Sequence, residues 1–184
     1  MPLFLGRVHG MPILDIGWHY GLIAGIAGLS GTLFGGWSAD YMVKKTKNRS
    51  WYILIPLAST IIAIPFALNT FLLMPNGYIA VYAYFIPTFF GGWYLAPCLA
   101  ANHFLVGIRM RAMASAVLLF MLNLIGLGLG PMLTGFASDY LTPEFGNNGL
   151  RYALSITMLV NIWCAFHYYC CLKTIKQDFD RAPA

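Results

Sequence analysis

The sequence predicts an all-α membrane protein, and three observations lead to this fold class. Only 9% of the 184 residues are charged and 59% are hydrophobic, whereas soluble domains carry about 25% charged residues. Long stretches contain no Asp, Glu, Lys or Arg, and these are 16–39, 50–108, 112–138 and 152–172. The alternating strands of a membrane β-barrel do not produce charge-free stretches of this length. The composition therefore excludes both a soluble domain and a transmembrane barrel.

Five membrane-spanning helices account for these stretches, because a helix needs about 20 apolar residues to cross a bilayer. The second stretch is long enough for two spans, and its LMPNGY segment at 73–78 supplies the turn between them. The predicted spans are about 16–39, 51–73, 77–101, 112–137 and 150–172. Residues 1–6 look like the end of a further span, and residues 173–184 are predicted to be a tail. No signal peptide is predicted, because no charged segment precedes an apolar one at the start.

Basic residues lie in alternate connections between the predicted spans, nine on one side and two on the other. The nine are Lys44, Lys45, Lys47, Arg49, Arg109, Arg111, Lys173, Lys176 and Arg181, and the two are Arg7 and Arg151. By the positive-inside rule, the 41–50 loop, the 102–111 loop and the C-terminus are cytoplasmic, and the 138–150 loop is outside. We expect a multi-pass protein of the plasma (inner) membrane. The net charge of +5 does not indicate nucleic acid, because the charges are not gathered on a polar face.

No metal site and no cofactor are predicted. The four cysteines, Cys98, Cys164, Cys170 and Cys171, lie in or at the ends of spans without a CxxC motif, which favours small apolar residues in lipid or core. Palmitoylation of Cys170 or Cys171 is the alternative. The histidines lie far apart without metal-ligand spacing, and they are His9, His19, His103 and His167.

One sequence pattern occurs twice, as GGWSADYM at 35–42 and as TGFASDYL at 134–141. Each copy places an aspartate, Asp40 or Asp139, where an apolar stretch ends. Because three predicted helices separate the copies, they are expected on opposite faces of the membrane, which is the geometry of an inverted-topology repeat. A chance similarity between small and aromatic residues is the alternative.

The position of Asp40 at the predicted end of a helix is unfavourable, because a carboxylate there faces the negative end of the macrodipole. We expect Lys44, or the positive N-terminus of another helix, to compensate it. Asp40 is then either a solvated residue at the end of a loop or part of a latch that ties one helix bundle to another in one conformation.

Glycines recur every three or four residues in the 16–39 span, and they lie on one face of the predicted helix. The row consists of Gly17, Gly21, Gly25, Gly28, Gly31 and Gly35. Such a face allows close helix packing, either as a static contact or as a surface that slides, and we expect Gly21, Gly25 and Gly28 to face a neighbouring helix. The GLGLGP segment predicts a bend in the 112–137 span, through Gly126, Gly128, Gly130 and Pro131. Prolines are also expected to break the 51–73 and 77–101 spans, at Pro56, Pro65, Pro87 and Pro97.

Few polar residues lie at the predicted membrane depth, and such residues are functional candidates. The candidates for substrate binding are Asn123, Thr88 and Asn161, with Ser59 and Thr60 weaker. For Asn123 an interhelical hydrogen bond is the alternative. The acidic residues Asp15, Asp40, Asp139 and Glu144 all lie at span ends, so none of them is placed to carry a proton at mid-membrane depth.

The segment GTLFGGWSADYMVKK at 31–45 resembles the loop signature of the major facilitator superfamily, in which a glycine and an aspartate precede basic residues. Gly36, Asp40, Lys44 and Lys45 match this signature. Tyr41 and Val43 replace its usual basic residue and glycine, which implies a looser latch. RMRAMASAVLLFMLNLIGLGLGPMLTGFASDYL at 109–141, with GLRYAL at 149–154, resembles the spinster-like branch, and FLGRVHGMP resembles the outer end of its seventh helix.

This resemblance implies that the five spans are helices eight to twelve of a twelve-helix secondary transporter. The chain would be a fragment, the C-terminal half, with the N-terminal half as its missing partner. The resemblance further implies a rocker-switch mechanism, small lipid-like substrates, and coupling to protons at a site in the missing half. The implied conformational latch consists of Gly36, Asp40, Lys44, Lys45, Arg109, Arg111 and Asp139.

Two other classes of function were weighed against a transporter. A membrane-embedded enzyme needs converging His, Asp, Glu or Ser side chains at one depth, and the sequence offers no such set. A truncated or accessory membrane subunit without transport activity of its own stays open as the alternative.

Overall fold

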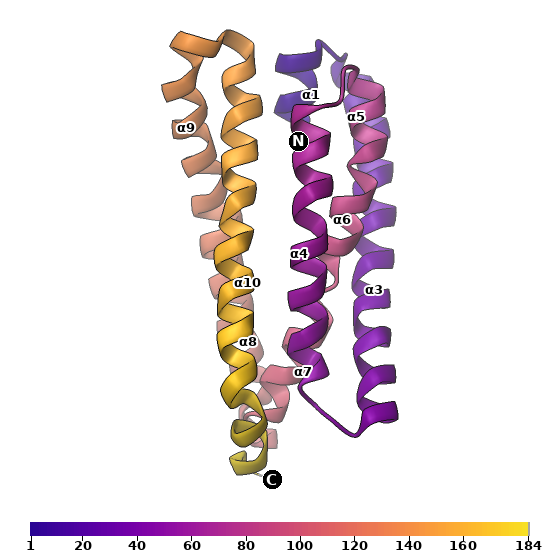
Figure 1. The fold of residues 1–184 in the computed structure, drawn as a ribbon, viewed down its shortest axis with the longest axis vertical. Coiled ribbons are helices and arrows are strands. Elements are labelled where there is room, and N and C mark those ends of the chain that lie inside the picture. Colours follow the sequence, from indigo (N-terminus) through magenta and orange to yellow (C-terminus); the bar gives the residue numbers. More distant parts are fainter. Residues whose placement is uncertain (184) are drawn as a thin grey trace.

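Residues 1–183 are described by a computed structural model, in which they form a bundle of long helices (Figure 1). Short α1 (Pro2–His9) and α2 (Ile13–Asp15) lead through the π-helical η1 (Ile16–Tyr20) into the long α3 (Gly21–Thr46). Next come α4 (Trp51–Leu72) and three consecutive pieces, α5 (Gly77–Ala83), α6 (Phe85–Gly92) and α7 (Leu95–Phe104). The last part contains η2 (Ile108–Met110), α8 (Arg111–Met121), the π-helical η3 (Leu122–Leu129), α9 (Gly130–Phe145), η4 (Gly146–Asn148) and α10 (Gly149–Arg181).

Four stretches of the described chain are long and apolar enough to cross a membrane. They are Ile13–Thr46, Trp51–Leu72, Gly77–Phe104 and Ile108–Arg181. The last has 74 residues, and as one straight helix it would measure about 110 Å, several times the thickness of a bilayer. The chain instead turns back at Gly146, whose φ is +56°, and α9 packs beside α10 (Figure 1). This stretch therefore consists of two antiparallel arms, and the predicted spans 112–137 and 150–172 lie one in each arm.

Several helices extend past the loop boundaries that the charge pattern predicts. α3 continues to Thr46, so the predicted 41–50 loop is reduced to residues 47–50. α9 continues to Phe145 and α10 continues to Arg181, through most of the predicted tail. Charged residues mark where a helix leaves the hydrocarbon layer, but a helix can continue beyond it because its backbone hydrogen bonds are internal. The predicted boundaries of these loops are wrong for this reason.

The prolines interrupt one of the two predicted spans and leave the other intact. α4 runs without a break from Trp51 to Leu72 through Pro56 and Pro65, so the expected breaks there are wrong. The Gly77–Phe104 stretch is interrupted after Ala83 and again at Trp93. Ala83 and Trp93 each lie four positions before a proline, Pro87 or Pro97. Because proline has no N–H group, the carbonyls of Ala83 and Trp93 lack their helical hydrogen-bond donor.

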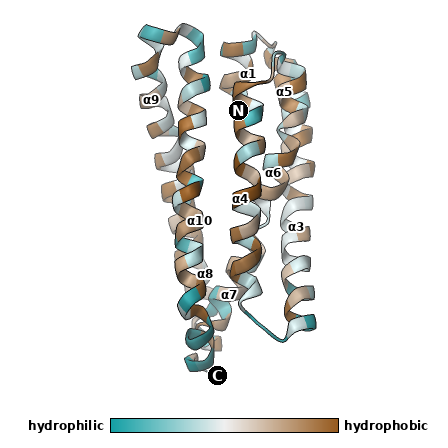
Figure 2. Ribbon diagram, viewed as in Figure 1, coloured by the Kyte–Doolittle hydropathy of each residue, from teal (hydrophilic) through white to brown (hydrophobic). Residues whose placement is uncertain are grey.

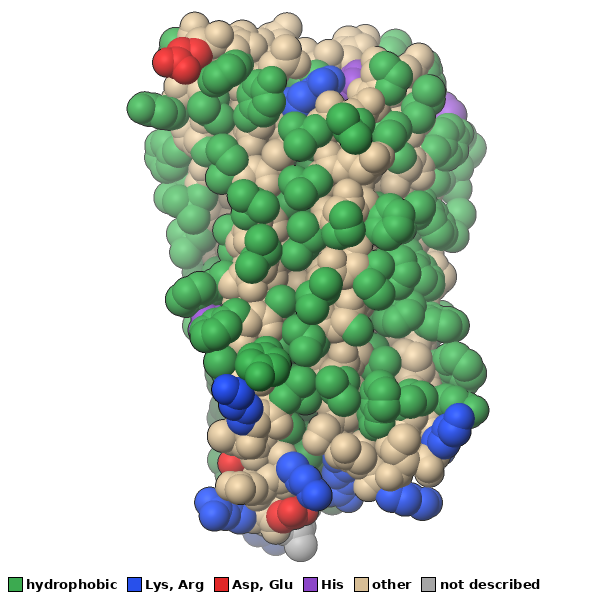
Figure 3. Space-filling model, viewed as in Figure 1, with side chains coloured by type: hydrophobic (Ala, Val, Ile, Leu, Met, Phe, Trp, Pro, Cys, Tyr) green, Lys and Arg blue, Asp and Glu red, His purple; other side chains and the backbone are tan. Residues whose placement is uncertain are grey.

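Hydrophobic residues occupy most of the middle of the molecule, and hydrophilic residues gather toward its two ends (Figure 2). Large apolar side chains such as Leu127 and Trp18 are 74% and 69% exposed. Soluble proteins rarely expose apolar side chains over so large a surface. Lysines and arginines crowd the end where α3 and α10 terminate (Figure 3). The protein is therefore an integral, multi-pass membrane protein whose outer surface contacts lipid or further helices.

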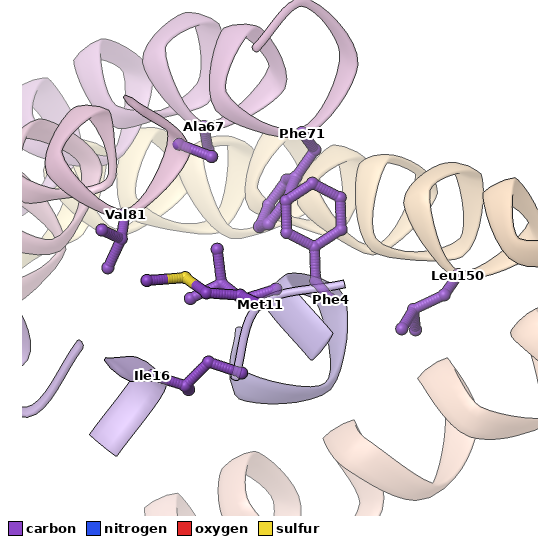
Figure 4. Packing of buried hydrophobic residues seen from close by; sticks show 9 residues of the cluster. Phe4, Met11, Ile16, Ala67, Phe71, Val81 and Leu150 are labelled. Carbon is purple, nitrogen blue, oxygen red and sulfur yellow. The ribbon is translucent and has the colours of Figure 1, made fainter. Parts of the chain in front are cut away.

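Two clusters of buried side chains hold the bundle together, one at each end. At the first end, α1 inserts Phe4 against Phe71 of α4, with ring centroids 5.3 Å apart in an edge-to-face arrangement (Figure 4). The neighbouring residues of this cluster are Leu5, Met11, Ile16, Ala67, Ala80, Val81 and Leu150. At the basic end, the second cluster joins α3, α4, α7 and α10 through Ala39, Tyr52, Ile53, Ala101, Ile175 and Phe179.

Candidate functional site

The tightest helix contact joins α3 to α6 and to the residues that follow it, and glycines make it possible. A Cβ atom on Gly31 would overlap the carbonyl oxygen of Phe89. A Cβ on Gly35 would lie 2.5 Å from the Cα of Trp93, and one on Gly92 would lie 3.1 Å from the carbonyl oxygen of Gly28. The two main chains therefore touch directly over about one turn and a half of helix.

The glycines that were expected to make this contact lie earlier in the same row. A Cβ on Gly21, Gly25 or Gly28 would meet no atom of residues 1–183 within 4 Å. Gly28 nevertheless meets the neighbouring helix through its carbonyl oxygen, which lies close to Gly92, and for Gly21 and Gly25 the packing stays a prediction. The direct backbone contact with α6 and Trp93 is therefore made by Gly28, Gly31 and Gly35.

The glycine-rich segment that was predicted to bend forms a π-helix instead of a simple kink. η3 covers Leu122–Leu129, and Gly130 and Pro131 follow it at the start of α9. A Cβ on Gly130 would lie 3.8 Å from the carbonyl oxygen of Ile125, five residues earlier, as expected for i→i+5 geometry. Glycine tolerates this backbone, and Pro131 leaves one carbonyl without a donor. A second π-helical stretch, η1, begins the arm that contains α3.

The two copies of the repeated pattern have the same local structure at opposite ends of the molecule (Figure 1). In each copy the residue before the aspartate, Ala39 or Ser138, is buried, while the tyrosine after it is exposed. Each helix continues for six residues beyond its aspartate and ends at a residue with positive φ, Lys47 or Gly146. The likeness therefore extends past the heptapeptide itself, to the place where each helix stops.

Asp40 accepts a hydrogen bond from the hydroxyl of Tyr52, at 2.7 Å. Tyr52 lies in the first turn of α4 and is 93% buried, so the bond ties the end of α3 to the start of the next helix. The expected ion pair with Lys44 is absent: in residues 1–183 no Lys or Arg nitrogen lies within 4.0 Å of an Asp or Glu oxygen. Asp40 also lies well before the last residue of α3, so the macrodipole argument, which holds only for the last turn, does not apply to it.

The other predicted latch residues lie at both ends of the molecule. Gly36 packs closely on α7, since a Cβ there would lie 3.1 Å from the Cβ of Ala96. Lys45 lies over the ring of Tyr41, 6.0 Å from its centroid. Arg109 and Arg111 lie at the start of the next arm, at the same basic end as Asp40. Asp139 lies at the opposite end and is exposed, and it makes no hydrogen bond within the described chain.

The predicted substrate-binding residues are not gathered in one place. Asn123 donates to the carbonyl of Leu119 at 2.7 Å, and Thr88 donates to the carbonyl of Tyr84 at 2.8 Å, each within its own helix. Asn161 donates to the carbonyl of Met158 at 3.1 Å and lines a small cavity of about 190 Å³ between α4, α6 and α10. Asn161 is the member of this set that lines the cavity between α4, α6 and α10.

Sequence reasoning missed an apolar groove between α7 and α8. It has a volume of about 470 Å³, within the range of small-molecule sites. Its lining residues are Asn102, Met110, Met113, Ala114, Val117, Leu118 and Met121. The amide nitrogen of Asn102 is buried and has no hydrogen-bond partner in the described chain. The signal in the sequence was Met110 and Met113 next to the two arginines, with Met121 farther along the same helix, but only the fold places Asn102 beside them.

A hydrogen bond fixes the two helices that form this groove. The ring Nε2 of His103, at the end of α7, lies 2.6 Å from the hydroxyl of Ser115 on α8. The bond therefore ties α7 to α8 at the residue that follows Asn102. An unsatisfied buried donor costs about 1–3 kcal/mol, and a ligand that brings an acceptor to Asn102 recovers that energy.

Polar contacts at the opposite end connect the start of the α3 arm to α5. The hydroxyl of Tyr78 donates to Asp15 at 2.6 Å, and Nδ1 of His19 lies 2.9 Å from the hydroxyl of Tyr82, one helical turn along both helices. Nearby, burial and the positive charge of Arg151 lower the pKa of His9 below its usual range. His9 is therefore held neutral at the end of the molecule that carries few basic residues.

Comparison with known proteins places this geometry in a family. No protein-family model matches the chain. An MFS-type efflux pump from Mycolicibacterium smegmatis is 33% identical over 153 residues, which are 83% of this chain and 35% of the pump. A crystal structure of a bacterial homologue of the human lysosomal transporter Spinster, inward-facing and occupied, matches with a TM-score of 0.83 and 25% identity, over 96% of this chain and 45% of that one. The chain belongs to the major facilitator superfamily.

This finding confirms the family, the all-α membrane fold and the spinster-like resemblance that the sequence predicted. Both relatives are named as transporters or as homologues of one, so this chain shares its fold with proteins of that class. The chain spans about a third of the length of the efflux pump and less than half of the Spinster homologue. What the whole protein transports, and how, is therefore argued as a proposal.

Proposed function

We propose that this chain is the C-terminal half of a secondary transporter that works by alternating access of the rocker-switch type. The observation that carries the proposal is the match of 96% of the chain to the inward-facing, occupied Spinster homologue. The chain covers less than half of that homologue and of the efflux pump, which is consistent with one half of a carrier. The repeated pattern supports it, because inverted repeats build many secondary transporters. The N-terminal half is the proposed partner, and any proton-coupling site is proposed to lie there.

The substrate class follows from the groove between α7 and α8. Its walls are apolar and contain three methionines, which adapt to flexible chains of varied shape. Its one buried, unsatisfied donor is the amide of Asn102. This combination suits a small amphipathic molecule with an alkyl part along the methionines and a polar acceptor at Asn102. Asn123, Thr88 and Asn161 remain proposed contacts elsewhere on the transport path.

The function is tested by transport, using the longest reading frame that ends in this chain. Proteoliposomes with that protein are expected to take up a fluorescent lysophospholipid. Asn102→Leu is expected to raise KM about tenfold, the effect of losing one hydrogen bond of about 1.4 kcal/mol, at unchanged surface expression. The matched control is Asn69→Leu, the same substitution at an exposed position of α4. Equal KM values in the two variants remove the groove from the substrate path.

The proposed orientation places the basic end in the cytoplasm, by the positive-inside rule, in the plasma membrane. Asn48 and Asn147 lie in the connections at opposite ends of the molecule. In a background without the native cysteines, a membrane-impermeant thiol reagent applied to intact cells is expected to label Asn147→Cys and to spare Asn48→Cys. Permeabilised cells serve as the control, in which both are labelled. Labelling of both positions in intact cells contradicts the topology.

The alternative function is a truncated or accessory membrane subunit without transport activity. The exposed apolar surface favours this accessory role if no second transporter half covers that surface. Sequencing the DNA upstream of Met1 distinguishes the two readings, because an in-frame extension with six or seven further spans supports the carrier. If the longest frame is this chain, and it moves no substrate alone, the accessory role is favoured.

A further inference from the structure

The basic end of the molecule contains a polar pocket that is separate from the groove between α7 and α8. It has a volume of about 500 Å³ and lies between the 47–50 connection and the last turns of α10. Its charged walls are formed by Lys47, Arg49, Lys176 and Asp180. Asn48 and Ser50 add neutral hydrogen-bonding groups to the same walls. Three cationic side chains against one carboxylate make this pocket cationic.

α10 reaches the pocket because it is longer than a membrane is thick. Its 33 residues measure about 50 Å at 1.5 Å per residue, whereas the hydrocarbon core is about 30 Å thick. The extension is held in place by Ile175 and Phe179, which are 2% and 6% exposed in the cluster with α4 and α7. The residues that follow them, Lys176 and Asp180, lie in the pocket wall.

The position of Arg49 is also fixed by aromatic contacts. Its guanidinium lies over the ring of Phe104, 4.8 Å from the centroid. Phe104 in turn meets Phe179 edge to face, with centroids 6.2 Å apart. A guanidinium stacked in this way keeps its N–H groups free to bind an anion in its plane. The same contacts therefore place Arg49 and the end of α10 on two sides of one cavity.

The connection between α3 and α4 is ordered rather than loose. The N–H of Ser50 donates to the side-chain oxygen of Asn48 at 2.9 Å, and the bond from Tyr52 to Asp40 holds the adjoining helices. The first turn of α4 contains no acidic residue. Within residues 1–183 no lysine or arginine of the pocket forms an ion pair with a carboxylate within 4.0 Å, and Asp180 is the one acidic residue that lines it.

We propose that this pocket binds a phosphate group, presented by the headgroup of an anionic phospholipid in the leaflet at the basic end of the molecule. The pocket lies just past the ends of the spans, at the level where headgroups lie. Basic side chains at this level attract anionic lipid, and arginine matches the geometry of a phosphate with two parallel hydrogen bonds. Inorganic phosphate offers the same chemistry from solution, and the experiment separates the two sources.

The test uses the purified chain in a neutral detergent, with thermal unfolding and native mass spectrometry as readouts. Phosphatidylglycerol is expected to raise Tm and to be retained, whereas phosphatidylcholine is not. Lys176→Gln is expected to weaken the apparent affinity for phosphatidylglycerol about tenfold, the effect of one charge-assisted contact, and Lys176→Arg is expected to retain it. The matched control is Lys173→Gln, which removes the same charge one helical turn away, outside the pocket wall.

Three outcomes decide the proposal. Selective loss in Lys176→Gln, with inorganic phosphate inactive, supports a lipid headgroup as the ligand. The same pattern of variants with inorganic phosphate alone supports the pocket with a soluble anion as its ligand. Equal weakening in Lys173→Gln and Lys176→Gln overturns the proposal, because binding then depends on net charge and not on the pocket. If Lys176→Gln is not stably folded, Arg49→Gln replaces it in the same comparison.

Discussion

Replacing Gly31 with alanine is expected to lower the free energy of unfolding by about 3 kcal/mol, the upper part of the usual range for overpacking. The added methyl group would overlap the carbonyl oxygen of Phe89, and a backbone atom cannot turn aside as a side chain can. α3 and α6 must therefore move apart, which also separates Gly35 from Trp93. Thermal unfolding in detergent, or unfolding in SDS, measures the loss.

The matched control is Gly25→Ala, the same substitution in the same helix and the same glycine row. A Cβ at Gly25 meets no atom of residues 1–183 within 4 Å, and alanine favours a helix by up to about 1 kcal/mol over glycine. Its stability is therefore expected to be unchanged or slightly raised. Equal losses in both variants would contradict the proposed cause, because only the Cβ of Gly31→Ala would overlap the backbone of α6.

The second large effect is expected at the bond between Tyr52 and Asp40. Tyr52→Phe removes only the hydroxyl that donates to Asp40 at 2.7 Å, and it is expected to lower the free energy of unfolding by about 1.5 kcal/mol, the lower part of the range for bonds to charged groups. Asp40→Ala is expected to have a similar effect. The double variant is expected to lose no more than the larger single loss, because both substitutions break one interaction.

The second copy of the repeated pattern provides the control for this cycle. Asp139 occupies the position that corresponds to Asp40 and is exposed like it, but it makes no hydrogen bond in the described chain. Asp139→Ala is therefore expected to leave stability within about 0.5 kcal/mol of the original, as for surface substitutions in general. A loss as large as that of Asp40→Ala would show that the repeat, and not the bond to Tyr52, determines the effect.

The charge pattern predicted the main features of the fold, because it depends on the membrane and not on tertiary contacts. Charge-free stretches indicate which segments are apolar enough to span, and the odd number of intervening helices places Asp40 and Asp139 at opposite ends. The helix ends were not predicted, because Thr46 and Arg181 lie beyond the layer that the charge pattern reports.

The candidate site was less predictable, because its parts come from segments that meet only in the fold. Helical periodicity places the glycines of the row within one broad arc of α3, but it does not state which of them meet α6. Nothing in the residues around Asp40 indicates Tyr52, twelve positions later, in preference to the nearer Lys44. Asn102 lies outside every motif, and its unpaired amide is visible only once α8 is packed beside α7.

The main-chain contact between α3 and α6 determines where this molecule is stiff and where it is compliant. No rotamer change can loosen a contact between backbones, so we expect the two helices to move together. The arm formed by α8, η3 and α9 contains eight residues in the wider π-helical geometry, which holds spare backbone that α-helical geometry does not need. We expect a change of shape to be absorbed by local shifts between the two geometries, in that arm and in the five π-helical residues of η1, while the contact between α3 and α6 keeps its form.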